Sequence, residues 1–551
     1  MSDKIHQDNK EREHFFSAAK LVAGITLISR IFGFIRDWGI TSLGATRYTD
    51  AFSLAFKIPN LFRRLFGEGA LASAFVPVFT DVYEKEGHEK ARKLLANSFA
   101  LLAVFLSALL VIGEVGFFLY SLVPGPKDRG LLMLLSMIMY PYMFTVCLLA
   151  LCSAAMNTRG HFAYPAAAPI IFNIFGIVAA WWIAPKFLGN LRGQLIIVSF
   201  SVVVAGVVQL VVVIWLLRKS GLYLRPCLLP IEPGIKSIIN LVTPMLLGLG
   251  FLQFSEYFQD IIAWNLTVTK EAASLNIFGW AIPCPLREGV IVRVQAARNF
   301  YQFPMGVLAI SLGVAVFPLL SRYAHRGDIP NLRDSINRAF RLSMMEGMAT
   351  GVGLFILAEP IMMIYARRKF TAVDAMQAAF VLKMYVLGMW AYCSYQILAR
   401  AFYACKDTKT PLKVSCILSV VNLILLLAMV WVPGIGPGAF GLSTTITFSI
   451  NALTLIYLLR KRLGRLGGRK IAVSFVRTSV ACAIMAGVVY FLQGYMKDMN
   501  NWLILGVCVP AGAIVFFTVV WILGAPELGE LRIGIKLSKE TESQTGTNSI
   551  S

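Results

Sequence analysis

Apolar residues occur along this chain in long runs, not in the short alternating patterns of a soluble protein. Runs of about 18 or more mostly apolar residues are long enough to cross a bilayer as helices. They recur from end to end and predict an all-α polytopic membrane protein with about 14 transmembrane helices. The expected spans are 15–40, 49–84, 96–124, 131–156, 162–184, 194–217, 234–265, 289–321, 333–365, 373–404, 411–432, 438–459, 471–494 and 501–523.

Charge or proline interrupts the first, second and eighth spans. Pro59 lies in the second span and Pro304 in the eighth. A proline removes a helix hydrogen bond and clashes with the preceding turn. Broken helices persist at membrane depth only where they line protein or water. These spans are therefore expected to face the interior of the molecule.

Prolines also reveal an internal repeat. The recurring pairs are Pro59 with Pro304, Pro77 with Pro318, and Pro165 with Pro411, at offsets of 245, 241 and 246 residues. The near-constant offset favours duplication of a six-span unit over chance alignment of loop prolines. Because six is even, both copies would insert the same way up, as in transporters built from two parallel repeats with the substrate between two lobes.

This repeat predicts two six-helix lobes followed by two extra C-terminal helices. The expected parts are a cytoplasmic N-terminal tail (1–14), an N-lobe (15–225), a C-lobe (226–462), spans thirteen and fourteen (463–524) and a polar, disordered cytoplasmic tail (525–551). The polar N-terminus and the lack of a small-residue cleavage site argue against a cleaved signal peptide.

Lysine and arginine are concentrated in the loops that follow even-numbered spans. The positive-inside rule then places both termini in the cytoplasm. One loop departs from this pattern, since Arg367, Arg368 and Lys369 follow the ninth span.

Composition supports the membrane interpretation. Hydrophobic residues make up 57% and charged residues 15% of the 551 residues, whereas soluble domains carry about 25% charged residues. The formal net charge of +22 would suggest nucleic acid as the partner of a soluble protein. Here it fits basic cytoplasmic loops and a basic cavity, so no nucleic acid is expected.

Catalytic and metal-binding motifs are missing from the sequence. The nine cysteines are scattered without a CxxC pair, and no HExxH or GxxxxGK[ST] occurs. We therefore expect no metal, no nucleotide-driven step and no enzyme activity, although a membrane transferase acting on an undecaprenyl lipid stays open as an alternative.

A cluster of charges lies in the first two spans. Arg30 and Asp37 are seven residues apart, as are Asp50 and Lys57, so each pair shares a helix face. A charge at the bilayer centre costs about 2.5–3.5 kcal/mol. The cluster therefore predicts a wet, basic interior that binds a diphosphate or a similarly acidic headgroup. The alternative is snorkelling or internal pairing, such as Arg36 with Asp37 or Lys57 with Asp50.

Two acids lie four residues apart in the seventh span, Glu256 and Asp260. They could hold a coupling cation or proton. Alternatively, they could lie at the interface or neutralise arginines across the cavity.

Several motifs resemble the MurJ/MviN family of the MOP exporter superfamily. They are SRIFGFIRD (29–37), TDAF (49–52), KIPNLFRRLFGEGA (57–70), AFVPVF (74–79) and YQFPMGVLAISLG (301–313). The resemblance implies a V-shaped, two-lobed flippase that moves lipid II outward across the bacterial cytoplasmic membrane by alternating access. It implies a groove for the polyprenyl tail formed by spans thirteen and fourteen. The implied partners are an undecaprenyl-diphosphate-linked muropeptide and the bilayer, with the chain as a monomer and contacts to cell-wall synthesis proteins.

The family's functional residues can be carried over by motif. Those expected to bind substrate are Arg30, Arg36, Asp37, Asp50, Lys57, Arg63 and Arg298. The family arginine five residues before the eighth-span proline corresponds to Asn299, and Arg298 is one step earlier. Residues 266–286 look like an insertion. Family members can hold a sodium ion in the C-terminal lobe, where span eleven offers Asn422 but no carboxylate.

These expectations combine into a mechanism without a cofactor. The arginines capture the diphosphate, Asp37 and Asp50 orient or release them, and the membrane potential favours outward movement of anions by about 2.3 kcal/mol per charge per 100 mV. Two other functions stay open. One is a MATE-like exporter of drugs or another glycolipid, coupled to H⁺ or Na⁺ through Glu256 and Asp260. The other is a scaffold for wall synthesis.

Overall fold

Two compact units make up the structure, a computed structural model that describes residues 2–67, 70–123, 127–187, 189–268, 274–277, 280–527 and 529. Unit 1 comprises Met1–Val292 with Arg368–Phe370, and unit 2 comprises Arg293–Arg367 with Thr371–Ser551. This division falls later in the chain than the predicted lobe boundary at residue 225. The seventh expected span therefore packs with unit 1.

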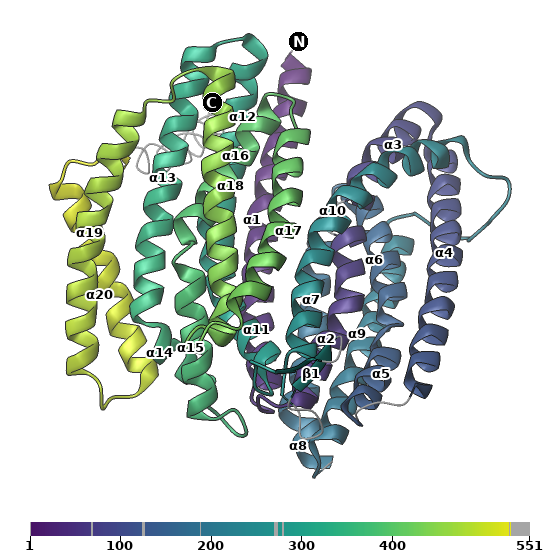
Figure 1. Cartoon of the computed structure of the whole chain (residues 1–551). Coiled ribbons are helices and arrows are strands. Elements are labelled where there is room, and N and C mark those ends of the chain that lie inside the picture. Colours follow the sequence, from purple (N-terminus) through teal and green to yellow (C-terminus); the bar gives the residue numbers. More distant parts are fainter. Residues whose placement is uncertain are drawn as a thin grey trace. The chain divides into compact units, whose positions relative to one another are not determined.

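Unit 1 is formed almost entirely by helices (Figure 1). They are α1 (Ser2–Thr41), α2 (Arg47–Phe62), the π-helical turn η1 (Arg63–Gly67), α3 (Ala70–Glu86), α4 (His88–Leu122), α5 (Lys127–Met139), α6 (Tyr142–Asn157), α7 (Ala163–Ile177), the π-helical turn η2 (Val178–Ile183), α8 (Ala184–Phe187), α9 (Leu191–Lys219) and α10 (Pro233–Asn265). The first turn of α11 (Val290–Pro304) also belongs to this unit.

Unit 2 continues from α11 to the C-terminus. Its helices are the π-helical turn η3 (Met305–Ala309), α12 (Ile310–Arg326), α13 (Ile329–Ile356), α14 (Ala358–Met363), α15 (Ala372–Val386), α16 (Met389–Ala404), α17 (Lys409–Met429), the short 3₁₀ turn η4 (Gly436–Gly438), α18 (Ala439–Leu463), α19 (Gly468–Tyr495) and α20 (Asn501–Ile522). Buried apolar side chains from α12, α13, α16 and α18 form a shared core, with Leu320, Phe340, Phe402 and Leu455 among them.

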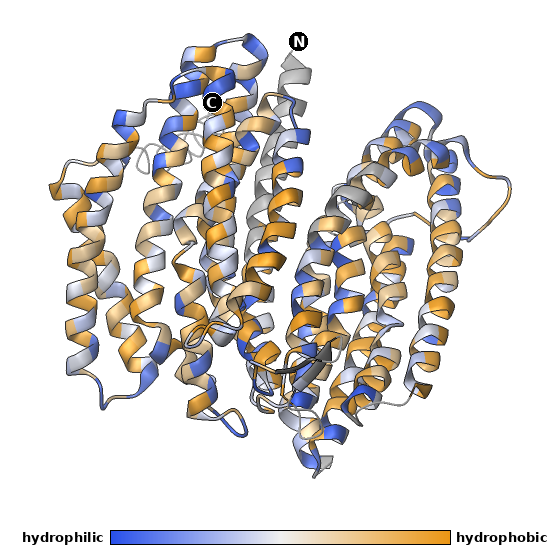
Figure 2. Ribbon diagram, viewed as in Figure 1, coloured by the Kyte–Doolittle hydropathy of each residue, from blue (hydrophilic) through white to orange (hydrophobic). Residues whose placement is uncertain are grey.

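Each expected span coincides with one helix or with a run of consecutive helices. Among the described residues, nine helices are long and apolar enough to cross a membrane, or ten if the bent pair α15 and α16 forms one span. Figure 2 shows hydrophobic residues along most of these helices and hydrophilic residues at many helix ends and loops. Four expected spans do not coincide with any of these nine or ten apolar helices: 15–40, 49–84, 234–265 and 333–365. They carry every candidate site residue except Arg298, and the total of fourteen crossings stays a prediction.

The expected breaks at Pro59 and Pro304 occur as π-helical turns, whereas α1 runs without a break through the first span. Helix α2 runs through Pro59 to Phe62 before η1 begins, and η3 follows Pro304 directly. A π-helical turn adds a residue to one turn and often marks a functional position. The second and eighth spans are thus both distorted beside the prolines that the repeat aligns.

A small strand pair lies inside the predicted insertion. Strand β1 (Ser274–Ile277) pairs antiparallel with β2 (Trp280–Pro283), with Ser274 opposite Pro283. The all-α prediction is confirmed apart from this hairpin, which no periodicity in the sequence indicated.

Candidate functional site

Arg36 of α1 is held by polar partners on two helices of unit 1. Its Nε and Nη2 atoms donate to Asp37 Oδ1 at 3.0 and 2.6 Å, and Nη1 donates to Asn173 Oδ1 at 2.9 Å. Asn173, on α7, in turn donates to the Ser29 carbonyl at 2.9 Å. The Arg36–Asp37 pair, considered from the sequence as an alternative to substrate binding, is therefore present. Charge-assisted bonds of this kind fix the direction of the guanidinium.

One face of α7 is shaped to receive this arginine. The Arg36 guanidinium lies 5.1 Å from the centroid of the Phe172 ring. A Cβ atom at Gly176 would lie 2.7 Å from Arg36 Cγ and 2.8 Å from Cδ. Phe172, Asn173 and Gly176 are spaced at three and four residues, so they share a helix face. Sequence reasoning missed all three, although their F-N-x-x-G spacing was a readable signal.

A second arginine lies near the same aromatic group. Arg63, the first residue of η1, donates from Nε to Asn60 Oδ1 at 2.9 Å. Tyr142 of α6 packs on Phe172 with ring centroids 5.3 Å apart, and it lies within electrostatic reach of both Arg36 and Arg63. Unit 1 therefore places two of the predicted arginines around Tyr142. We call Arg36, Arg63, Tyr142, Phe172 and Asn173 the arginine cluster.

The acids of α10 are paired with basic side chains of α2 and η1. Lys57 forms an ion pair with Asp260, whose side chain is 3% exposed. Arg64 donates to Glu256 and to Gln253, both at 3.1 Å. Lys57 thus has Asp260 of α10 as its described ion-pair partner, where the sequence suggested Asp50. The other suggestion, that these acids neutralise basic groups, agrees with the geometry.

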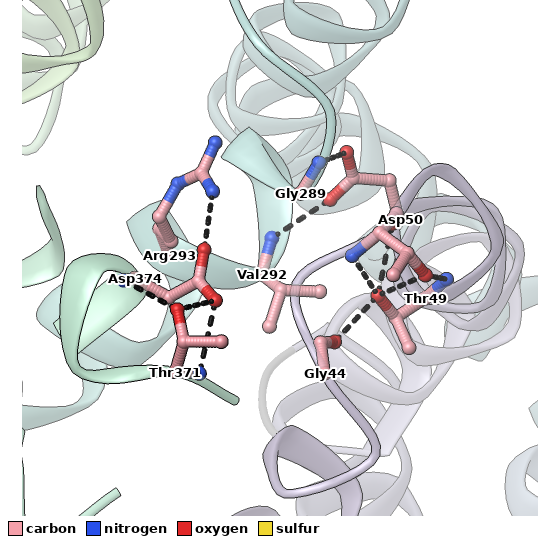
Figure 3. Close-up of polar contacts among 9 residues, drawn as sticks. Gly44, Thr49, Asp50, Gly289, Val292, Arg293, Thr371 and Asp374 are labelled. Carbon is pink, nitrogen blue, oxygen red and sulfur yellow. Dashed lines mark hydrogen bonds and ion pairs between the residues drawn. The ribbon is translucent and has the colours of Figure 1, made fainter. Parts of the chain in front are cut away.

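Asp50 caps a helix. It is fully buried, and its two carboxylate oxygens accept hydrogen bonds from the backbone N–H groups of Gly289 at 2.8 Å and Val292 at 3.0 Å (Figure 3). These groups lie at the start of α11, where backbone N–H groups have no acceptor within the helix. A carboxylate at this end also interacts favourably with the helix dipole. The buried acid therefore fixes the start of α11 to α2.

The other two predicted arginines have no described contact with the arginine cluster. Arg30 is exposed on α1. Arg298 is 4% exposed on α11 and belongs to unit 2. Its neighbour Asn299 accepts a hydrogen bond from Gln295 at 2.9 Å. In the same unit, Arg293 forms an ion pair with Asp374 at 2.8 Å, which Figure 3 also shows and which the sequence did not indicate.

The position in span eleven where family members can hold sodium has an amide among hydroxyl groups in this chain, and no carboxylate. Asn422 of α17 is buried and donates to Thr447 Oγ1 at 3.0 Å and to Thr444 Oγ1 at 3.4 Å, both on α18. These contacts join the two helices.

The basic loop that departs from the charge pattern has partners within unit 1. Arg368 donates to the carbonyls of Ala180 and Trp181 at 3.3 and 3.4 Å and lies 5.1 Å from the Trp181 ring centroid. The Lys369 N–H donates to the Ser42 carbonyl at 3.1 Å. This loop is therefore basic for a local structural reason.

A family model described as lipid II flippase MurJ matches residues 40–507. The chain belongs to the MurJ family. It is 28% identical over 530 residues to the lipid II flippase MurJ of Burkholderia cenocepacia, covering 93% of this chain and 98% of that protein. It is 29% identical over 501 residues to the probable lipid II flippase MurJ of Vibrio cholerae, covering 88% and 90% respectively.

Solved structures share the fold of this MurJ family member. The inward closed conformation of a lipid II flippase MurJ matches with a TM-score of 0.72 and 23% identity, over 91% of this chain and 98% of that one. An inward-facing multidrug resistance MATE family transporter of the MOP superfamily matches with a TM-score of 0.65 and 12% identity, over 81% and 98%. The predicted resemblance to the MurJ/MviN family is confirmed.

Proposed function

We propose that this chain is a flippase that moves lipid II from the inner to the outer leaflet of the cytoplasmic membrane by alternating access. The observation that carries the proposal is the family match over residues 40–507. The arginine cluster supports it chemically, because its guanidinium groups suit the diphosphate of a lipid-linked sugar.

The diphosphate binds at Arg36 and Arg63 in this proposal. An arginine has five N–H donors in a planar fork that matches phosphate oxygens. Three donors of Arg36 are bonded to Asp37 and Asn173, so two are left for an incoming anion. Asp37 keeps the guanidinium oriented before the substrate arrives. Further substrate contacts proposed from the family motifs are Arg30, Asp37, Lys57 and Arg298, whereas Asp50, which the motifs also suggested, caps α11.

No nucleotide or bound cofactor drives the cycle in this proposal. The headgroup follows a polar path while the polyprenyl tail stays in lipid, which avoids the cost of moving polar groups through hydrocarbon. The membrane potential contributes about 2.3 kcal/mol per charge per 100 mV towards outward movement of the anion. The chain acts as a monomer with both termini in the cytoplasm, and contacts with cell-wall synthesis proteins are a further expectation.

The ion pairs of the two α10 acids argue against the alternative function, a MATE-like exporter coupled to H⁺ or Na⁺. Glu256 and Asp260 would be the coupling acids of a MATE-like transporter, and both are engaged with Arg64 and Lys57. A paired acid neutralises its partner without needing a transported cation. We therefore favour the flippase.

The decisive experiment measures lipid II on the outer leaflet of cells depleted of their own flippases, with this chain as the sole replacement. Arg36→Ala should abolish translocation, and Arg36→Lys should retain part of it because the charge remains without the fork. Arg326→Ala is the matched control, since this arginine is exposed at the end of α12 and has no partner among the described contacts. If the Arg36→Ala variant translocates lipid II as well as the wild-type chain does, capture by this arginine is refuted. If the wild-type chain itself does not translocate lipid II, the proposed function is refuted.

A further inference from the structure

Arg400 is an arginine of unit 2 that neither the family motifs nor the mechanism above uses. It lies on α16, and its Nη1 atom donates to the Gln396 carbonyl at 2.9 Å and to Gln396 Oε1 at 3.4 Å. Both acceptors belong to its own helix. Across the described ranges, no aspartate or glutamate forms an ion pair with it. The side chain is partly exposed, so a ligand can reach it.

The guanidinium points into the helix bundle and not towards the nearby end of α16. Arg400 precedes the last residue of that helix, Ala404, by only four positions. A lysine or arginine so close to a helix end ordinarily extends past the end to reach water. Arg400 instead bonds Gln396, one turn in the opposite direction. Snorkelling therefore does not account for its position.

A glycine on α12 makes room for this arrangement. A Cβ atom at Gly313 would lie 2.2 Å from Arg400 Nη1 and 2.7 Å from Cζ. Gly313 is buried and precedes the end of α12 at Arg326 by 13 residues, or about 20 Å at the helical rise of 1.5 Å per residue. The guanidinium thus lies against an interior turn of the apolar segment 290–326, in a position that any larger residue at 313 would fill.

A guanidinium in such a place needs a counter-charge. Charged groups within membrane spans are costly, and they usually pair with an opposite charge or line a substrate pathway. Arg400 uses only Nη1 in the hydrogen bonds described, which leaves the Nε–H and both Nη2 protons for an acceptor. That remaining edge is the bidentate edge that recognises phosphate or carboxylate.

We propose that Arg400 is a substrate-contacting residue that binds an anionic group of the lipid-linked precursor within unit 2, with Gly313 as the positioning residue that admits its guanidinium. This inference rests on the proposed flippase function. The precursor carries two sources of suitable anions, the diphosphate and the carboxylates of its peptide. The chemistry of the contact is the same for both.

The test measures the affinity of the full chain, in lipid nanodiscs, for two probes. One is undecaprenyl diphosphate, which has no peptide, and the other is the complete lipid II. Arg400→Gln should weaken binding of at least one probe by about tenfold, the loss of one charge-assisted contact. Arg400→Lys should be intermediate. Gly313→Ala should weaken the same probe although it retains the charge, because the new Cβ displaces the guanidinium. Arg326→Gln, at the exposed end of α12, is the matched control and should bind like the wild type.

The pattern of loss identifies the anion. If the Arg400 and Gly313 variants bind both probes more weakly, the contact is with the diphosphate. If they bind only lipid II more weakly, the contact is with the peptide carboxylates. Thermal unfolding of each variant confirms that the protein is folded.

The proposal is overturned if Arg400→Gln and Gly313→Ala are folded and bind both probes like the wild type, while Arg36→Ala weakens them. In that case the flippase function stands and Arg400 only packs against α12. If the wild-type chain binds neither probe, the proposed function and this inference both fail.

Discussion

At the scale of single residues, the position of Arg36 depends on a neighbour without a side chain. Gly176 lies against the aliphatic part of Arg36, and Asn173 and Phe172 hold its guanidinium. The same relation recurs between Gly313 and Arg400. In both cases a glycine on one helix allows an arginine of another helix to lie across its surface. Glycines inside these helices are therefore functional positions in our interpretation.

Gly176→Ala should reduce lipid II translocation strongly without unfolding the protein. Alanine favours a helix over glycine by about 1 kcal/mol. The new Cβ would meet the flexible Arg36 side chain and not a backbone. The arginine should therefore move, and stability should change little. Translocation in depleted cells and thermal unfolding in detergent measure the two effects.

Gly116→Ala provides the control for that variant. Gly116 lies in α4, and a Cβ atom at this position would have no neighbour within 4 Å among the described residues. The same exchange there should leave translocation unchanged. Equal translocation by Gly176→Ala and the wild type would show that the exact position of Arg36 does not matter.

At the scale of elements, ion pairs join α10 to α2 and η1. Lys57 pairs with Asp260, and Arg64 pairs with Glu256. A buried ion pair contributes little net stability compared with apolar residues, but removing one partner leaves an uncompensated charge. The Lys57–Asp260 pair therefore fixes how α10 packs on α2, whereas Arg64 and Glu256 are partly exposed and contribute less. Both pairs explain why charges occur in spans that are otherwise apolar.

Asp260→Asn should lower the free energy of unfolding by about 3–5 kcal/mol, because Lys57 would lose its buried counter-charge. The double variant Lys57→Met with Asp260→Leu should recover most of that loss. Unfolding by heat and denaturant in detergent measures both. A double variant as unstable as Asp260→Asn would contradict the pairing.

Transport by the stable double variant then decides whether either charge has another role. Unchanged lipid II translocation would remove Lys57 from the substrate contacts and Asp260 from the candidates for ion coupling. Loss of translocation in the folded double variant would support one of those roles.

At the scale of the whole molecule, the distribution of basic residues predicts orientation in the membrane. Loops after even-numbered spans are rich in lysine and arginine, including the segment after α18. The turn between α19 and α20 follows an odd-numbered span. The basic loop at 367–369 is the departure, and Arg368 and Lys369 have structural partners within unit 1. Because this loop is basic for a structural reason, we apply the positive-inside rule to the other loops only.

Cysteine labelling in intact cells tests this orientation. Lys497→Cys, between α19 and α20, should react with a membrane-impermeant maleimide added outside. Lys461→Cys, near the end of α18, should react only after the membrane is permeabilised. The exposed native Cys227 is first replaced by serine to remove its background. Labelling of Lys461→Cys in intact cells would reverse the proposed orientation.

The sequence by itself determined the helical class, the approximate limits of the spans and the family. Long apolar runs specify helices that satisfy their own backbone hydrogen bonds in lipid, so these features follow from local composition. The family motifs occupy continuous stretches such as residues 29–37 and 57–70, which need no knowledge of distant contacts. The arginines were recognisable because charge is rare in such segments.

Only the tertiary structure decided which partner each charge has. Lys57 is 203 residues from Asp260, and Arg36 is 137 residues from Asn173. Asp50 caps a helix that begins 240 positions later. Such pairings depend on which helix faces come together, and an apolar run carries little information about its rotation or its neighbours. The strand pair of residues 274–277 and 280–283 and the choice of which glycine receives which arginine likewise depend on which segments come together.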